Sequence, residues 1–141
     1  MSDSPTAPGC AFCAIVAGTA PAYRILEDEH CLAFLDIAPF STGHTLVVPK
    51  AHARTLLDMA EPDAGRVLAT ASRVARRIAE VLAPEGFTLL QTNEAAGWQT
   101  VFHVHLHVIP RWREDGILPP ALPPRRSDDL PEIARLLAEA P

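Results

Sequence analysis

HVHLHVIPR, residues 103 to 111, alternates three of the chain's six histidines with branched apolar residues. Side chains of a strand point alternately to its two faces, so the pattern predicts a strand with Val104, Leu106 and Val108 facing a core. The three histidines would then share the opposite face. Same-face neighbours lie roughly 6.6 Å apart, so the outer two imidazoles are roughly 13 Å apart and cannot share one small ion.

The three histidines therefore cannot all bind the same ion and must have more than one function. Two neighbouring imidazoles could share a metal ion, or one could bind a metal while the others bind an anion. The alternative is a strand whose solvated polar face merely contains histidine. Because half of all the histidines fall in this one alternating run, the sequence favours a chemical function for it.

The composition is that of one globular domain. The chain has 141 residues, of which 48% are hydrophobic, which is enough to bury a core. Lys and Arg number 12 against 17 Asp and Glu, and the net charge of -5 argues against a general nucleic-acid-binding protein. Residues 1–9 are a polar tail unlike a signal peptide, and no apolar run is long enough to span a membrane. We expect one cytoplasmic domain over residues 1–141, with no nucleic-acid or membrane partner.

The order of strand and helix signals predicts an α+β fold. Besides the histidine strand, the patterns predict strands over residues 23–27, 31–35, 44–48 and 87–92. The first two form a hairpin, and residues 36–43 form a loop because they contain Pro, Ser, Thr and Gly. Hairpin connections of this kind favour a mainly antiparallel, five-stranded sheet.

Three helices are expected around this sheet. A short one covers residues 10–16, and a long one runs from Pro62 to a stop at Pro84, with apolar residues at three- and four-residue spacing and a solvated arginine face. Residues 112–141 form a Pro-rich carboxy-terminal segment, whose prolines from 119 to 124 exclude regular helix or central strand. A short last helix is expected near Asp129, with Glu132 completing a capping box.

The cysteines indicate a metal site. Cys10 and Cys13 form a CxxC pair, which in a reducing compartment suits a metal or a redox couple better than a structural disulfide. A thioredoxin-like role would need a strand before the pair, and only a short tail precedes it. Two cysteines are half of a zinc site, and histidines are the expected other half. Cys31 lies in an apolar run and is expected to be a buried core residue.

Several spaced motifs resemble one family. The alternating histidines, followed by Pro110 and Arg111, resemble the signature of the histidine triad family of nucleotide hydrolases and transferases. FLDIAPFSTGHTLVVPKAH, residues 34–52, looks like that family's nucleoside-binding segment, and CAFCAIVAG, residues 10–18, looks like its zinc-carrying bacterial branch. With Asn93 and Gln99, the resemblance covers roughly residues 10–111.

The resemblance implies a set of catalytic residues. His105 matches the nucleophile, whose neutral ring nitrogen would attack the α-phosphorus of a nucleotide and form a covalent nucleotidyl-histidine that water resolves. His107 and His44 match positions around the phosphate, where they would donate hydrogen bonds to the developing charge.

The resemblance also completes the metal site. His52 and His103 match the two remaining ligands, so that Cys10, Cys13, His52 and His103 would form a closed tetrahedral site. A closed site has no open position for water, so the zinc is expected to be structural and to tie the amino-terminal helix to the catalytic strand.

The nucleotide contacts follow from the same comparison. Asp36 matches the carboxylate that accepts hydrogen bonds from the ribose hydroxyls. The apolar walls of the base pocket match Phe12, Ile15, Phe34, Ile37 and Leu46. Asn93, Gln99 and Thr100 match side chains that line the phosphate and leaving-group side. Trp98 departs from the family, which commonly has glycine at this position, and an indole there would affect substrate choice.

The expected function is a purine nucleotide phosphoramidase or nucleotidyl hydrolase acting at the α-phosphate. A diadenosine polyphosphate hydrolase or a nucleotidyl transferase is the enzymatic alternative, and a zinc-stabilised nucleotide-binding interaction module is the non-enzymatic one. A DNA-deadenylating enzyme is disfavoured by the acidic charge. The resemblance further implies a homodimer, whose carboxy-terminal tail could reach the partner's pocket.

Overall fold

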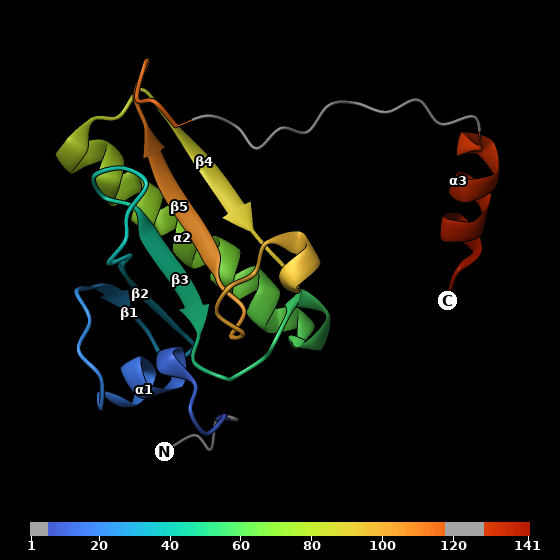
Figure 1. Cartoon of the computed structure of the whole chain (residues 1–141), viewed down its shortest axis with the longest axis horizontal. Coiled ribbons are helices and arrows are strands. Elements are labelled where there is room, and N and C mark those ends of the chain that lie inside the picture. Colours follow the sequence, from blue (N-terminus) through green and yellow to red (C-terminus); the bar gives the residue numbers. More distant parts are fainter. Residues whose placement is uncertain (1–5, 118–128) are drawn as a thin grey trace.

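One five-stranded antiparallel sheet organises the chain (Figure 1). The computed structural model describes residues 6–117 and 129–141. The strands lie in the order β1-β2-β3-β5-β4. Their bounds are β1 Arg24–Glu27, β2 Cys31–Leu35, β3 Thr45–Pro49, β4 Gly86–Gln91 and β5 Leu106–Arg111. The helices are α1 Ala11–Ala17, α2 Glu61–Leu82 and α3 Leu130–Glu139, with short 3-10 turns η1 Leu56–Asp58 and η2 Ala95–Gly97. The predicted α+β class and antiparallel sheet are confirmed.

The two faces of the sheet carry two separate apolar cores. Leu106, Val108 and Val47 pack with residues of α2 on one face. On the other face, Leu46 and Phe34 pack with Phe12 of α1. Because strand residues alternate between faces, His107, which pairs with Leu46 across the β3–β5 ladder, lies on the α1 face. The alternation of the histidine strand therefore separates a structural face from a chemical one.

The histidine strand is shorter than the sequence predicts. β5 begins at Leu106, which pairs with Val47, so His103 and His105 precede the strand. β3 continues past this last pair to Pro49, whose carbonyl oxygen lies 2.8 Å from Nε2 of His103. A proline is tolerated here because β5 does not reach this end of β3 and requires no N–H from it. The alternative interpretation, a strand with a solvated polar face, is wrong because His103 and His105 are both buried.

Helix α2 covers the face of the sheet opposite α1 (Figure 1). Its buried side chains are Val67, Thr70, Ala71, Val74 and Ile78, as the spacing predicts. Its arginines are not all free in solvent. Arg73 pairs with Asp28 at 2.9 Å and Arg77 donates to the carbonyl oxygen of Ile25, so the polar face of the helix also holds the β1–β2 hairpin.

The carboxy-terminal helix α3 forms where the sequence predicts it, but without the expected cap. Asp129 occupies the N-cap position and makes no side-chain capping hydrogen bond. The Pro-rich stretch from 119 to 124 lies outside the described residues. Within the ranges the structure does describe, we find no helix with the length and apolar character needed to cross a bilayer.

The loop between β2 and β3 depends on one glycine. Gly43 has φ +89°, and a Cβ at this position would lie 2.6 Å from Cδ1 of Leu82. We expect Gly43→Ala to lower the free energy of unfolding by about 1–3 kcal/mol, because alanine is strained in this backbone region. Gly65 lies at an exposed position of α2, where a Cβ would meet nothing within 4 Å, so Gly65→Ala is the matched control and should stabilise the protein by about 1 kcal/mol. Urea unfolding measures both, and equal effects of the two substitutions would contradict this role of Gly43.

Candidate functional site

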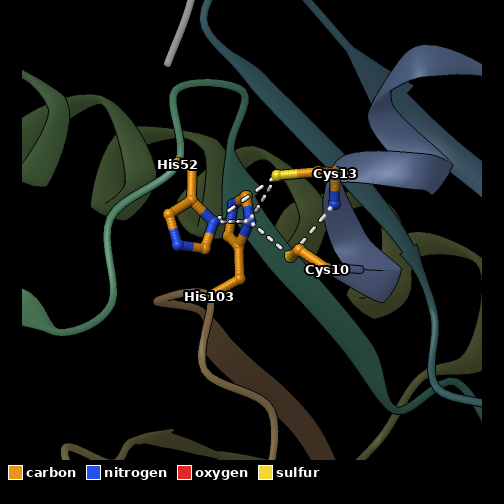
Figure 2. Close-up of side chains that lie close together, drawn as sticks. All are labelled: Cys10, Cys13, His52 and His103. Carbon is orange, nitrogen blue, oxygen red and sulfur yellow. Dashed lines mark hydrogen bonds between the residues drawn. The ribbon is translucent and has the colours of Figure 1, made fainter. Parts of the chain in front are cut away.

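Four side chains from three separate segments converge beside α1. Figure 2 shows Cys10 and Cys13 from the start of α1, His52 from the loop after β3 and His103 from the segment before β5, all pointing toward one another. Nδ1 of His103 lies 3.4 Å from Sγ of Cys10 and 3.6 Å from Sγ of Cys13. Nδ1 of His52 lies 3.4 Å from Sγ of Cys13 and 3.2 Å from Nδ1 of His103. This set is the one the sequence predicts as a metal site.

The spacing of these four atoms fits a zinc ion. With the usual Zn–S and Zn–N bond lengths, the edges of a tetrahedral site measure about 3.6 Å between sulfur and nitrogen and about 3.3 Å between two nitrogens. The four distances above lie close to these values. The carbonyl of Pro49 can only accept, so Nε2 of His103 carries the proton and Nδ1 presents its lone pair to the cluster. The donor set and its geometry therefore suit a closed Cys2His2 site.

Local structure also prepares the thiols for a cation. Cys10 is the N-cap of α1, and its Sγ accepts a hydrogen bond from the backbone N–H of Cys13 at 3.3 Å. Without a cation, burial raises the pKa of the Cys13 thiol. A divalent cation bound here would favour loss of that proton, because its charge would stabilise the thiolate.

His105 lies next to this cluster, and the backbone of His103 fixes the orientation of its ring. Its Nδ1 is 2.7 Å from the carbonyl oxygen of His103. Because a carbonyl only accepts, Nδ1 carries the proton, and Nε2 is left with an unprotonated lone pair. The ring of Phe12 meets His105 edge to face at 5.2 Å. Burial lowers the pKa of His105, which keeps the ring neutral and nucleophilic.

A second histidine pair lies beyond His105 on the same face of the sheet. Nε2 of His44 is 2.9 Å from Nδ1 of His107, and Nδ1 of His44 accepts from the backbone N–H of Phe40 at 3.0 Å. Oδ2 of Asp36 is 3.7 Å from Nε2 of His44. Burial, followed by the neighbouring His105 and His44, lowers the pKa of His107 to about 4. The structure thus brings together all three residues predicted to be catalytic.

Most of the residues predicted to wall the base pocket lie together on this face. Phe12, Phe34 and Leu46 belong to one buried cluster, with Ile15 packed against it. Ile37 differs, because 87% of its side chain is exposed. It lies in the loop after β2, so it could only cover a ligand from outside.

The residues predicted on the leaving-group side divide into two kinds. Gln99 is buried, and its side-chain amide forms hydrogen bonds only with backbone groups. It accepts from the N–H of Glu94 and donates to the carbonyls of Arg54 and Val101. Asn93 exchanges hydrogen bonds with Gln91 and accepts from the backbone N–H of Leu56. These two side chains shape the loop. Thr100 and Trp98 are exposed, and Trp98 is held at φ +74°.

Two residues of this region were missed by sequence reasoning. Arg54 pairs with both carboxylate oxygens of Glu94, at 2.8 and 2.9 Å, and its guanidinium lies 4.2 Å from the ring centroid of Phe102. It therefore clamps the loop that leads into the histidines. Phe40 is the other, since its N–H reaches His44. No periodicity marks either residue. The Arg54 contact joins positions distant in sequence, and the Phe40 contact is made by a backbone N–H that any residue type but proline could provide.

Comparison with known proteins finds one family. A family model described as HIT domain matches residues 17–114. A HIT family protein from Bacillus anthracis superposes with a TM-score of 0.87 at 36% identity, covering 94% of this chain and 97% of that one. A Zn-bound histidine triad family protein from Mycobacterium smegmatis is 45% identical, with a TM-score of 0.73 over 92% of this chain and 90% of that one. An adenylylsulfatase from Arabidopsis thaliana is 36% identical over 106 residues, which are 75% of this chain and 54% of that protein.

Proposed function

This chain belongs to the HIT domain family, and from that premise we propose that it is a purine nucleotidyl hydrolase that forms its covalent intermediate on His105. The observation that carries the proposal is the hydrogen bond from Nδ1 of His105 to the carbonyl of His103. It leaves Nε2 unprotonated in a ring that burial keeps neutral. A neutral imidazole with its lone pair free is what attack on phosphorus requires.

The reaction proceeds in two displacements. Nε2 of His105 attacks the α-phosphorus, and the bond from phosphorus to the leaving group breaks, with the electron pair going to the leaving group, which takes up a proton from solvent. Water next attacks the same phosphorus and releases a proton to solvent, the P–N bond breaks, and its electron pair returns to Nε2 of His105. The products are the nucleoside monophosphate and the free leaving group. The carbonyl of His103 holds the ring throughout, since the proton on Nδ1 stays in its hydrogen bond.

The remaining residues bind and orient the substrate. His107 donates a hydrogen bond to the charge that develops on the phosphoryl oxygens. Asp36 accepts hydrogen bonds from the ribose hydroxyls. The base lies against the apolar walls formed by Phe12, Ile15, Phe34 and Leu46, with Ile37 over its exposed edge. Thr100 and Trp98 border the leaving group, while Asn93 and Gln99 hold the loop from which they project.

We assign a structural zinc ion to Cys10, Cys13, His52 and His103. Bound there, it would cross-link the chain, because the four residues come from α1, the loop after β3 and the segment before β5. Four protein ligands would fill a tetrahedral site and leave no open position at which a water could act on substrate. The thiol ligands also favour a reducing compartment, which is why we place the protein in the cytoplasm.

The leaving group is the least constrained part of the proposal. A phosphoramidate, which releases an amine, stands first, and a diadenosine polyphosphate is the alternative. The Arabidopsis relative adds adenylyl sulfate as a third candidate. Incubation with adenosine phosphoramidates, diadenosine polyphosphates, adenylyl sulfate and nucleotide sugars, compared by kcat/KM, ranks these classes. Trapping with a nucleotide labelled at the α-phosphate should place an acid-sensitive label on His105, and product formation without that label would contradict the mechanism.

The proposal includes a homodimer joined at the edge of the sheet. β4 is an edge strand, and Phe87 and Leu89 on it are exposed. Unpaired strand edges bearing apolar side chains are favourable sites for association. Light scattering should give twice the mass of the chain, and a monomer at all concentrations tested would exclude this assembly.

A non-catalytic nucleotide-binding module is the alternative from another functional class. Loss of activity in the His105 variant would decide for the enzyme over this module.

The acid limb of the pH profile should lie below the ordinary range for histidine. Burial lowers the pKa of His107 from 6.5 to about 4 and also lowers that of His44. A histidine with a lowered pKa stays neutral as the pH falls through 6.5 and takes up its proton only closer to its folded value. We therefore expect kcat/KM, which reports the free enzyme, to hold its neutral-pH value below pH 6.5. Zinc content measured at each pH is the control, and an acid limb at or above 6.5 with zinc retained would contradict it.

A further inference from the structure

Asp36, His44 and His107 form a second cluster of groups that could ligate a cation. One carboxylate oxygen and two imidazole nitrogens lie within 4.8 Å of one another. None of them belongs to the cluster of Cys10, Cys13, His52 and His103. The cluster can therefore act as a metal site or as a chain of hydrogen bonds. The direction of each hydrogen bond distinguishes the two.

The direction is set at Phe40. Its backbone N–H can only donate, so Nδ1 of His44, 3.0 Å away, must accept. A neutral imidazole has a single N–H, so the proton of His44 is on Nε2. That N–H faces Nδ1 of His107 at 2.9 Å, against 3.7 Å to Asp36, and donates to the closer atom. Nδ1 of His107 then accepts, and the proton of His107 is on Nε2.

We propose that the N–H of Phe40 and the ring of His44 form a relay that selects the tautomer and orientation of His107, which makes His44 a positioning residue for the reaction. The inference rests on the proposed function and deepens it, because it assigns the hydrogen-bond donor of the phosphate site to a single atom, Nε2 of His107. His44 contributes through His107 and not by its own contact with phosphate. Its ring is fully buried, which leaves no edge for a ligand.

A metal ion at this cluster is disfavoured by the same hydrogen bonds. Ligation through Nε2 of His44 would move its proton to Nδ1, where it would face the N–H of Phe40. Two donors would then oppose each other in a buried site, and the lost hydrogen bond would not be replaced by water. The cluster is therefore better suited to a relay than to a cation.

The loop that carries Phe40 is anchored so that its N–H stays in place. Ser41 donates its hydroxyl to the carbonyl of Pro110 on β5 at 2.7 Å, and the N–H of His44 donates to the carbonyl of Ser41. The ring of Phe40 stacks on His44 with centroids 5.1 Å apart and planes 23° apart. Donor, acceptor and ring plane are thus held by the same short segment.

The first test reads the tautomers directly. In zinc-loaded protein with isotope-labelled histidine at neutral pH, long-range proton–nitrogen NMR correlations should show His44 and His107 with the proton on Nε2 and His105 with it on Nδ1. Assignments come from single-histidine variants. Phe40→Ala, which keeps the backbone N–H, should leave the His44 pattern unchanged. A proton on Nδ1 of His44 would overturn the relay, whether or not the protein hydrolyses nucleotides.

The second test is a double-mutant cycle on the best substrate of the panel. His44→Ala should lower kcat by roughly tenfold to a hundredfold with KM changed by less than about threefold, because the lost effect belongs to a donor engaged in the transition state. His107→Ala should lose at least as much. The double variant should be no slower than His107→Ala, since a residue that acts only through its neighbour has nothing further to lose. Additive losses, or a rise in KM for His44→Ala alone, would show an independent contact with phosphate and overturn the proposal.

Metal analysis separates the relay from the rival cation site. Protein dialysed against excess zinc should retain one equivalent per chain, held by the cysteine and histidine cluster. A second equivalent that disappears in His44→Ala would overturn the relay. If no substrate of the panel is turned over, the proposed function fails, while the NMR and metal results still decide the relay.

Discussion

Replacing His105 with alanine is expected to lower kcat by more than about a thousandfold while the Kd for AMP changes by no more than about tenfold. The variant removes the ring whose Nδ1–H donates to the His103 carbonyl and whose Nε2 is left unprotonated for attack. The proposed base and ribose contacts come from other residues, so the monophosphate should still bind. Single-turnover kinetics measures the first quantity, and calorimetry with AMP measures the second.

His30→Ala is the matched control for this prediction. His30 lies in the β1–β2 hairpin with a partly exposed side chain, 3.8 Å from Glu29 and away from the site. Its activity should equal that of the wild type. Loss of AMP binding together with turnover in the His105 variant would indicate a collapsed site, and full turnover without His105 would rule out the nucleotidyl-histidine.

Removing the zinc ligands is expected to have the second largest effect. Cys13→Ser should lose the metal and lower the free energy of unfolding by several kcal/mol, because structural zinc binds small domains with about 10–16 kcal/mol. The reason lies in connectivity, since the four ligands join three segments of the chain at one point. Metal analysis and urea unfolding, with and without chelator, give both quantities.

Cys31→Ala separates the metal effect from the loss of a thiol. Cys31 is fully buried in the α2-side core and takes no part in the cluster, so its variant should keep one zinc per chain and lose only packing energy. Equal unfolding curves with and without chelator in the wild type would contradict a structural metal.

Loss of the metal should also slow the reaction. His103 contributes its ring to the metal cluster and its carbonyl to His105. When the ring is released, the carbonyl is less well held, and His105 loses the contact that fixes its tautomer. We therefore expect zinc-depleted protein to have a lower kcat even where it remains folded.

The sequence predicts the fold well where one periodicity decides a segment. The buried stripe of α2 follows its spacing, and β2 and β3 form where short apolar runs predict strands, because each of these patterns lies within one element. The start of β5 is different. His103 looks like a strand residue by alternation, yet the ladder begins at Leu106, since His103 turns to donate to Pro49.

The candidate site shows the same division between sequence and structure. Residue types and order, read against a known family, were enough to select Cys10, Cys13, His52 and His103, because metal ligands must be of particular kinds. The tautomer of His103 and the clamp formed by Arg54 depend on contacts between residues distant in sequence, His103 with Pro49 and Arg54 with Glu94. No local pattern encodes such a pair.

The sequence by itself determined which side chains can attack, ligate or line a pocket, since those capacities belong to residue types and to their spacing along a strand or helix. Only the tertiary structure decided where each imidazole keeps its proton. That choice depends on which backbone group lies opposite each ring nitrogen, the carbonyls of Pro49 and His103 or the N–H of Phe40. A carbonyl demands a donor and an N–H demands an acceptor, and folding alone brings each of them to its ring.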